Sequence, residues 1–237
     1  MVSIQTNHEV LTCKEGEPKG EFTKIGNFGV YKTGSASDKV LAIFPDIYGY
    51  RLNNVKLIAD RFAENLGIQV FILDLFDEDP ITEKSDRGAW LTKHSPDKKT
   101  PLVKEFLAEV KKTLSPKFLA AIGYCYGAKF VFENLTKDSL LDVGAVAHPS
   151  FTQVSDVESL EKPLVISLAE HDEYFSDDLR AKTLEILQKK NIRYQIDLYS
   201  GTSHGFSVRG DLSDPVIKYA VEKALLDQIH WFRSFIN

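Results

Sequence analysis

Short apolar runs that do not alternate with polar residues recur along this chain, and helical patterns separate them. A strand that buries one face alternates, so continuous runs predict strands buried on both faces, as in a parallel sheet. Regular alternation of such strands with helices predicts a doubly wound, mostly parallel α/β sheet with helices on both faces. The predicted strands are Val40–Phe44, Gln69–Leu73, Lys117–Gly123, Val143–His148, Pro163–Ala169 and Arg193–Tyr199.

The predicted helices have apolar residues at spacings of three and four. Asn53–Asn65 ends shortly before Gly67, and Pro215–Phe235 begins with a proline, which fits a first helical turn. Between these two come Pro101–Leu114, Lys129–Leu135 and Leu179–Lys189. Because no repeat and no long Pro/Gly/Ser linker divides the 237 residues, we expect one α/β domain over residues 1–237.

Composition argues against several classes of protein. The net charge is −5 and basic residues occur only in short groups, which argues against a nucleic-acid partner. Met1–Lys14 lacks the pattern of a signal peptide, and no apolar run reaches the roughly 20 residues of a membrane span. Two cysteines, Cys13 and Cys125, are too few for a disulfide framework. By elimination we expect a cytoplasmic protein that binds no membrane; the oligomeric state has no signal in the sequence.

The most informative segment is Gly123-Tyr124-Cys125-Tyr126-Gly127, a G-x-C-x-G sequence between a predicted strand and a predicted helix. This is the context of a nucleophile elbow, with Cys in place of Ser. The glycines relieve crowding at the sharp turn, and the following helix directs its backbone N–H groups toward the nucleophile. Chance predicts only about 0.007 occurrences in a chain with this composition. The alternative is a buried structural cysteine in a tight turn.

A thiol nucleophile needs a base, and the base needs an acid that orients it. His204 follows the predicted strand Arg193–Tyr199, and Asp172 follows the predicted strand Pro163–Ala169. The order Cys125, Asp172, His204 matches the nucleophile, acid, base order of α/β-hydrolases. Each residue taken alone has a simpler interpretation, since a loop aspartate is usually a solvated cap and most histidines are not catalytic. His148, after another predicted strand, either lines the pocket or packs in the core.

Four separated segments resemble the dienelactone hydrolase (carboxymethylenebutenolidase) family, particularly its fungal members. They are "PDIYG", "GYCYGAKF", "AEHDEYF" and "SGTSHGFSVRGD", and the similarity runs from about Cys13 to Trp231. The resemblance implies an α/β-hydrolase fold and a cysteine hydrolase with no metal and no organic cofactor. It also implies an oxyanion hole made by the backbone N–H groups of Tyr126 and Ile47. Asp46 stands where the family has an acidic residue that holds or activates the thiol, often Glu; the alternative is a loop cap.

The resemblance also bears on the substrate. Family members that act on dienelactone hold its carboxylate with arginines, and Arg209, five residues after His204, is similar to one of them. Arg51 and Arg87 are nearby candidates for a second arginine, although surface charge is the simpler interpretation of both. We therefore expect a small-molecule ester or lactone as substrate. Two alternatives stay open, a ligand-binding protein with weak turnover and a redox sensor based on Cys125, with Cys13 as a conceivable resolving thiol.

Overall fold

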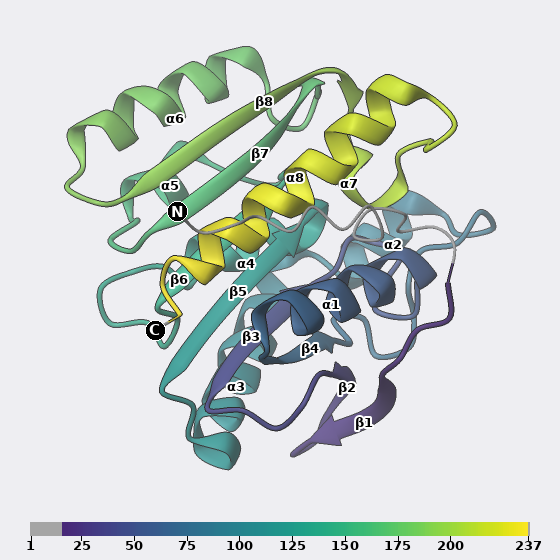
Figure 1. Cartoon of the computed structure of the whole chain (residues 1–237). Helices are drawn as coiled ribbons and strands as arrows, with labels where there is room; N and C mark the ends of the chain where they lie inside the picture. Colours follow the sequence, from purple (N-terminus) through teal and green to yellow (C-terminus); the bar gives the residue numbers. More distant parts are fainter. Residues whose placement is uncertain (1–15, 237) are drawn as a thin grey trace.

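The computed structural model describes residues 16–236 and contains one eight-stranded sheet with the order β1-β2-β4-β3-β5-β6-β7-β8 (Figure 1). The strand β1 pairs antiparallel with β2, and β2 pairs antiparallel with β4, whereas all pairs from β4 to β8 are parallel. The strands are β1 (Glu21–Ile25), β2 (Phe28–Thr33), β3 (Lys39–Phe44), β4 (Gln69–Leu73), β5 (Phe118–Tyr124), β6 (Val143–Ala147), β7 (Leu164–His171) and β8 (Tyr194–Ser203).

Helices cover both faces of this sheet, as the apolar runs predicted. Along β3, Leu41 and Ile43 pack toward α1 and α8, while Ala42 and Phe44 pack toward α3 and α4. Both sets are fully buried, which is why the strand shows no polar alternation. The helices are α1 (Asn53–Leu66), α2 (Arg87–Lys93), α3 (Pro96–Leu114), the 3-10 turn η2 (Cys125–Gly127), α4 (Ala128–Glu133), α5 (Val154–Glu158), α6 (Asp177–Lys189), α7 (Phe206–Arg209) and α8 (Pro215–Arg233).

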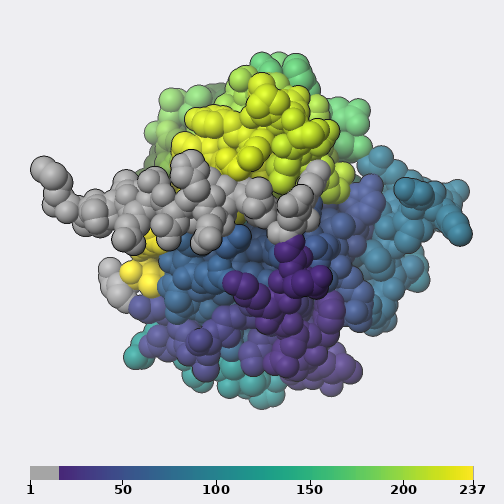
Figure 2. All heavy atoms as spheres, turned by 45° about the vertical axis from the view of Figure 1, so that its right-hand side comes forward, coloured from purple at the N-terminus to yellow at the C-terminus, as the bar shows by residue number. Residues whose placement is uncertain are grey.

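The strands β1 and β8 form the two edges of the sheet. Figure 2 shows β1 and β2 in purple at the lower end of one face, with α8 in yellow toward the upper end. Within residues 16–236, no helix combines the length and the apolar character needed to cross a membrane. Cys13 and the segment Met1–Lys14 lie outside the described residues.

The predicted strands and long helices are confirmed, whereas the strands β1 and β2 at one edge of the sheet were not predicted. In β1, every residue except Ile25 is exposed, so this strand lacks the apolar run that marks a buried one. The third helix begins at Pro96 rather than at Pro101, which it accommodates in its interior. The strand β8 continues to Ser203, because an irregularity at Ala169/His171 lets His171 pair with Ser203.

The parallel strands bring the candidate residues to one edge of the sheet. Asp46 follows β3, Cys125 follows β5, Asp172 follows β7 and His204 directly follows β8. Because parallel strands share the direction of their carboxyl ends, these four loops meet although their residues are far apart in sequence.

Candidate active site

Cys125 occupies the apex of the turn between β5 and the helical turn η2. Its backbone φ is 50°, in the left-handed region that residues with a side chain rarely adopt. A Cβ at Gly123 would lie 2.4 Å from the Gly127 carbonyl oxygen, and one at Gly127 would lie 2.0 Å from the Phe44 carbonyl oxygen. Neither position accepts a side chain, so the two glycines permit a turn that presents the Cys125 thiol to the cavity.

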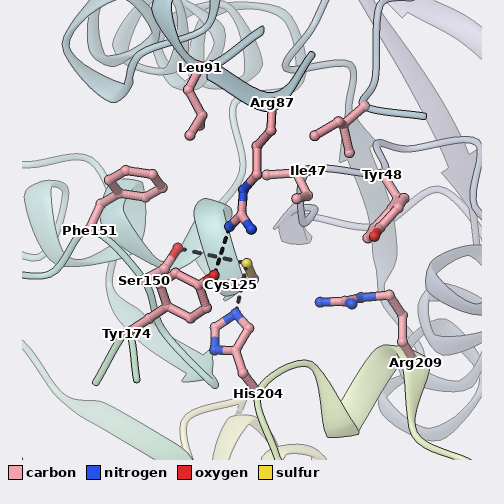
Figure 3. A pocket seen from close by; sticks show the side chains of 11 residues that line it. Ile47, Tyr48, Arg87, Leu91, Cys125, Ser150, Phe151, Tyr174, His204 and Arg209 are labelled. Atoms are coloured by element: carbon pink, nitrogen blue, oxygen red, sulfur yellow. Dashed lines mark hydrogen bonds between the residues drawn. The ribbon is translucent and has the colours of Figure 1, made fainter. Parts of the chain in front are cut away.

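A continuous hydrogen-bonded chain joins a carboxylate, an imidazole and the thiol. His204 Nε2 lies 3.0 Å from Cys125 Sγ (Figure 3), and His204 Nδ1 lies 2.9 Å from both carboxylate oxygens of Asp172. The Asp172 side chain is 2% exposed, and its Oδ1 also accepts the Tyr174 N–H at 2.9 Å. The carboxylate is therefore held in place and fixes the orientation of the imidazole.

The environment of His204 favours its charged form. Burial lowers the pKa of His204, but hydrogen bonds to Asp172 and Cys125 outweigh burial and raise the pKa to about 9. The imidazole thus holds a proton readily once it has accepted one from the thiol. At neutral pH the protonated imidazole is therefore the favoured form, which suits a group that later donates this proton.

The thiol opens into a cavity of about 230 Å³, a volume that fits a compact substrate. Apolar side chains and two guanidinium groups surround Cys125 in Figure 3. The lining residues are Ile47, Tyr48, Ile81, Arg87, Leu91, Cys125, Ser150, Phe151, Tyr174, His204 and Arg209.

The two expected oxyanion-hole residues flank the thiol. Tyr126 follows Cys125 at the start of the helical turn, and its hydroxyl donates a hydrogen bond to the His94 carbonyl at 2.6 Å. Ile47 lines the cavity, and its carbonyl accepts the Ile81 N–H at 2.9 Å. These contacts hold both segments beside Cys125.

Asp46 contacts Arg209 rather than the thiol. Its carboxylate accepts a hydrogen bond from Arg209 Nε at 2.8 Å and another from the Tyr48 N–H at 3.0 Å. The Arg209 guanidinium also stacks on the Tyr48 ring, 4.9 Å from its centroid. Burial raises the pKa of the Asp46 carboxyl, and the charge of Arg209 opposes this shift. In this structure the hydrogen bonds of the Asp46 carboxylate go to Arg209 and Tyr48, and a role of Asp46 toward the thiol stays a prediction.

Comparison with known proteins shows to which protein family this chain belongs. Residues 28–236 match the model of the dienelactone hydrolase family. The chain belongs to the dienelactone hydrolase family. Among curated relatives, the hydrolase tropI of Talaromyces stipitatus is 35% identical, over 94% of this chain and 92% of its own length. Dienlactone hydrolase 1 of Gibberella moniliformis is 31% identical, over 91% of this chain and 88% of its own length.

Solved structures support the α/β-hydrolase fold. An esterase from the Planctomycetes species Thermogutta terrifontis superposes with a TM-score of 0.68 at 13% identity, over 92% of this chain and 95% of that one. At this identity the likeness shows the fold alone. Membership of the dienelactone hydrolase family, in turn, supports the hydrolysis of ester or lactone bonds as the reaction class.

His148 lies next to His204 in the protein interior and does not line the pocket. His148 was predicted either to line the pocket or to pack in the core, and the structure supports core packing, because the side chain is fully buried and absent from the cavity wall. Its Nε2 is 2.8 Å from Ser207 Oγ, and its ring lies 5.2 Å from that of His204. Burial and the neighbouring His204 lower the pKa of His148 well below its ordinary value, so His148 packs as a neutral ring.

Arg87, Tyr174 and Ser150 are among the cavity side chains that were not assigned to the site from the sequence. Arg87, interpreted from the sequence as surface charge, lines the cavity and donates a hydrogen bond to the Tyr174 hydroxyl at 2.8 Å. The Tyr174 ring lies 4.6 Å from the His204 ring, and Ser150 Oγ lies 3.7 Å from Cys125 Sγ. Because Tyr174 stands only two residues after Asp172, the sequence could have indicated that it lies near the site. Arg51, the other candidate arginine, pairs with Glu78 instead.

Proposed function

We propose that this protein is a cysteine-dependent hydrolase that cleaves a small ester or lactone through an acyl-thioester intermediate. The observation that carries the proposal is the chain from Asp172 through His204 to Cys125, with contacts of 2.9 and 3.0 Å at the wall of a substrate-sized cavity. A binding protein has no need of all three groups in this geometry.

In the proposed mechanism, His204 takes the proton of the Cys125 thiol while Asp172 orients the imidazole. The thiolate attacks the substrate carbonyl carbon, and the carbonyl oxygen becomes an oxyanion that the backbone N–H groups of Tyr126 and Ile47 stabilise. When the carbon–oxygen single bond breaks, the leaving oxygen takes the proton from His204, and the acyl-thioester remains. Water, deprotonated by His204, then attacks the thioester and releases the acid and the thiol.

The shape and charge of the cavity support a compact substrate that carries a carboxylate. Arg87 and Arg209 both line the cavity, whereas none of its lining residues in the described chain is acidic. Because Asp46 already balances the charge of Arg209, Arg87 is the stronger attraction for an incoming anion. A thiol expels an alkoxide or enolate more readily than an amine, so lactones and enol esters suit this site better than peptides.

The test compares wild type with Cys125→Ala and Cys125→Ser on a short-chain aryl ester and on a carboxylated enol-lactone. We expect Cys125→Ala to lose turnover of both and the wild type to prefer the carboxylated compound. A burst of leaving group in single-turnover experiments, followed by slower release of acid, would reveal the acyl-enzyme.

Two outcomes of this test would contradict the proposed hydrolase. If wild type turns over neither compound, or if Cys125→Ala retains full turnover, the proposed triad is wrong and a ligand-binding or redox-sensing role for this fold takes its place.

A further inference from the structure

The thiol of Cys125 has a second polar neighbour besides His204. Among residues 16–236, the side-chain hydrogen-bond partners of Cys125 Sγ are His204 Nε2 at 3.0 Å and Ser150 Oγ at 3.7 Å. Ser150 is 2% exposed, and in Figure 3 its hydroxyl points toward the sulfur from a different side than the imidazole. Sulfur accepts hydrogen bonds weakly as a thiol and strongly as a thiolate, so this hydroxyl is placed to respond to the charge on Sγ.

The loop after β6 is shaped to hold Ser150 in this place. The Ser150 N–H donates a hydrogen bond to the Cys125 carbonyl at 3.1 Å, so one residue contacts both the backbone and the side chain of the nucleophile. His148 and Phe151, on either side, have φ values of 37° and 56°. Positive φ at residues with side chains is strained and persists where the surrounding structure imposes it, most often at functional sites.

Asp46, the residue expected to hold the thiol, is engaged elsewhere. Its two carboxylate oxygens accept hydrogen bonds from Arg209 Nε and the Tyr48 N–H. Ser150 therefore supplies the polar contact to sulfur that Asp46 does not make in this structure.

We propose that Ser150 is a further catalytic residue, whose hydroxyl donates a hydrogen bond to the Cys125 thiolate and holds the sulfur in position for attack. This inference rests on the proposed function, in which Cys125 is the nucleophile. The proton stays on Ser150 Oγ throughout, and no bond to Ser150 forms or breaks. The contact weakens when acylation removes the charge from sulfur, and it re-forms when thioester hydrolysis returns the thiolate. Ser150 thereby assists both formation of the thiolate and its departure.

The test measures the pH dependence of Cys125 alkylation by iodoacetamide, which needs no substrate. Mass spectrometry of the Cys125 peptide separates this reaction from that of Cys13. In Ser150→Ala, we expect the alkylation midpoint to move to higher pH by about one unit, with a roughly tenfold slower reaction below the midpoint. The plateau at high pH should match wild type, since the thiolate then forms without help.

Two further variants separate a hydroxyl effect from a packing effect. Ser150→Thr keeps the hydroxyl and should stay close to the wild-type midpoint. Ser167→Ala removes a hydroxyl that is fully buried on β7, where it accepts a hydrogen bond from Gln228, and should leave the profile unchanged. The inference is overturned if Ser150→Ala follows the wild-type profile, or if Ser150→Ala and Ser150→Thr change it equally.

Failure of the proposal for Ser150 can be distinguished from failure of the proposed function. Turnover that persists in Cys125→Ala would reject Cys125 as the nucleophile whatever the alkylation profile shows. Turnover lost in Cys125→Ala, together with an unchanged profile in Ser150→Ala, would reject only the role of Ser150.

Discussion

Arg209 donates a hydrogen bond from Nε to the Asp46 carboxylate at 2.8 Å, across a sequence separation of 163 residues. The aspartate is 1% exposed, whereas the arginine side chain is 31% exposed and reaches the cavity. The pair therefore joins the loop after β3 to the helix α7 and holds one cation at the wall of the site. This relationship explains why the acidic residue of the early loop does not contact the thiol.

Removing the Asp46 carboxyl group should destabilise the fold. In Asp46→Ala, Arg209 Nε and the Tyr48 N–H both lose their acceptor, and we expect the free energy of unfolding to fall by about 1–3 kcal/mol. Urea unfolding followed by circular dichroism measures the change. Glu185→Gln breaks the exposed pairs with Lys182 and Lys189 and should leave the midpoint unaltered. Equal midpoints for Asp46→Ala and wild type would contradict the prediction.

The charged form of His204 should make stability depend on pH. Burial lowers the pKa of His204, but its hydrogen bonds to Asp172 and Cys125 raise it from 6.5 to about 9. A pKa raised by folding stabilises the fold fully below about pH 6.5, and this contribution is lost as pH rises through about 9. Between these values we expect wild type to lose about 1–3 kcal/mol more of its unfolding free energy than His204→Gln does.

The control for this measurement is a neighbouring exposed histidine. The His171 side chain is 71% exposed, so His171→Gln should keep the wild-type pH dependence. If the two histidine variants lose stability with pH in the same way, His204 is not the group responsible.

Arg87 should set the preference for substrates that carry a carboxylate. Its guanidinium lines the cavity and contacts the Tyr174 hydroxyl. In Arg87→Gln, we expect the ratio of kcat/KM for a carboxylated ester to that for its uncharged analogue to fall roughly tenfold. Tyr174→Phe should shift the ratio in the same direction by less, because it removes only the contact that positions the guanidinium.

The matched control is Arg51→Gln, since Arg51 binds Glu78 and does not line the cavity. Its substrate ratio should equal that of wild type. An unchanged ratio in Arg87→Gln would show that the carboxylate is bound elsewhere.

Gly127 should not accept even one methyl group. In Gly127→Ala, the new Cβ would lie 2.0 Å from the Phe44 carbonyl oxygen, on the central strand β3 that has little room to shift. We expect a loss of about 3 kcal/mol or more, with activity lost at the same time. Gly88→Ala, in the helix α2 with 3.4 Å to its nearest neighbour, should be neutral or stabilising. Thermal unfolding compares the two, and similar melting temperatures would refute the crowding argument.

The layers of the fold and the order of the candidate catalytic residues could be predicted because local patterns encode them. A strand buried on both faces needs a continuous apolar run, and Val40–Phe44 and Gln69–Leu73 are such runs. The edge strand β1 escaped prediction because its exposed residues carry no such pattern. The end of β8 was also missed, since an irregularity in pairing, not residue type, extends it to Ser203.

By itself, the sequence determined the elbow around Cys125 and the loops that carry Asp172 and His204, because crowding at a strand–helix turn and the direction of parallel strands are local or topological constraints. Only the tertiary structure decided the partners of these groups. From the sequence alone, Arg87 would be interpreted as a solvated charge and Ser150 as an ordinary loop residue. Only the folded chain brings both to the cavity wall. The physical reason is that a polar side chain owes its role to its neighbours in space, and neighbours from different loops leave no periodicity in the sequence.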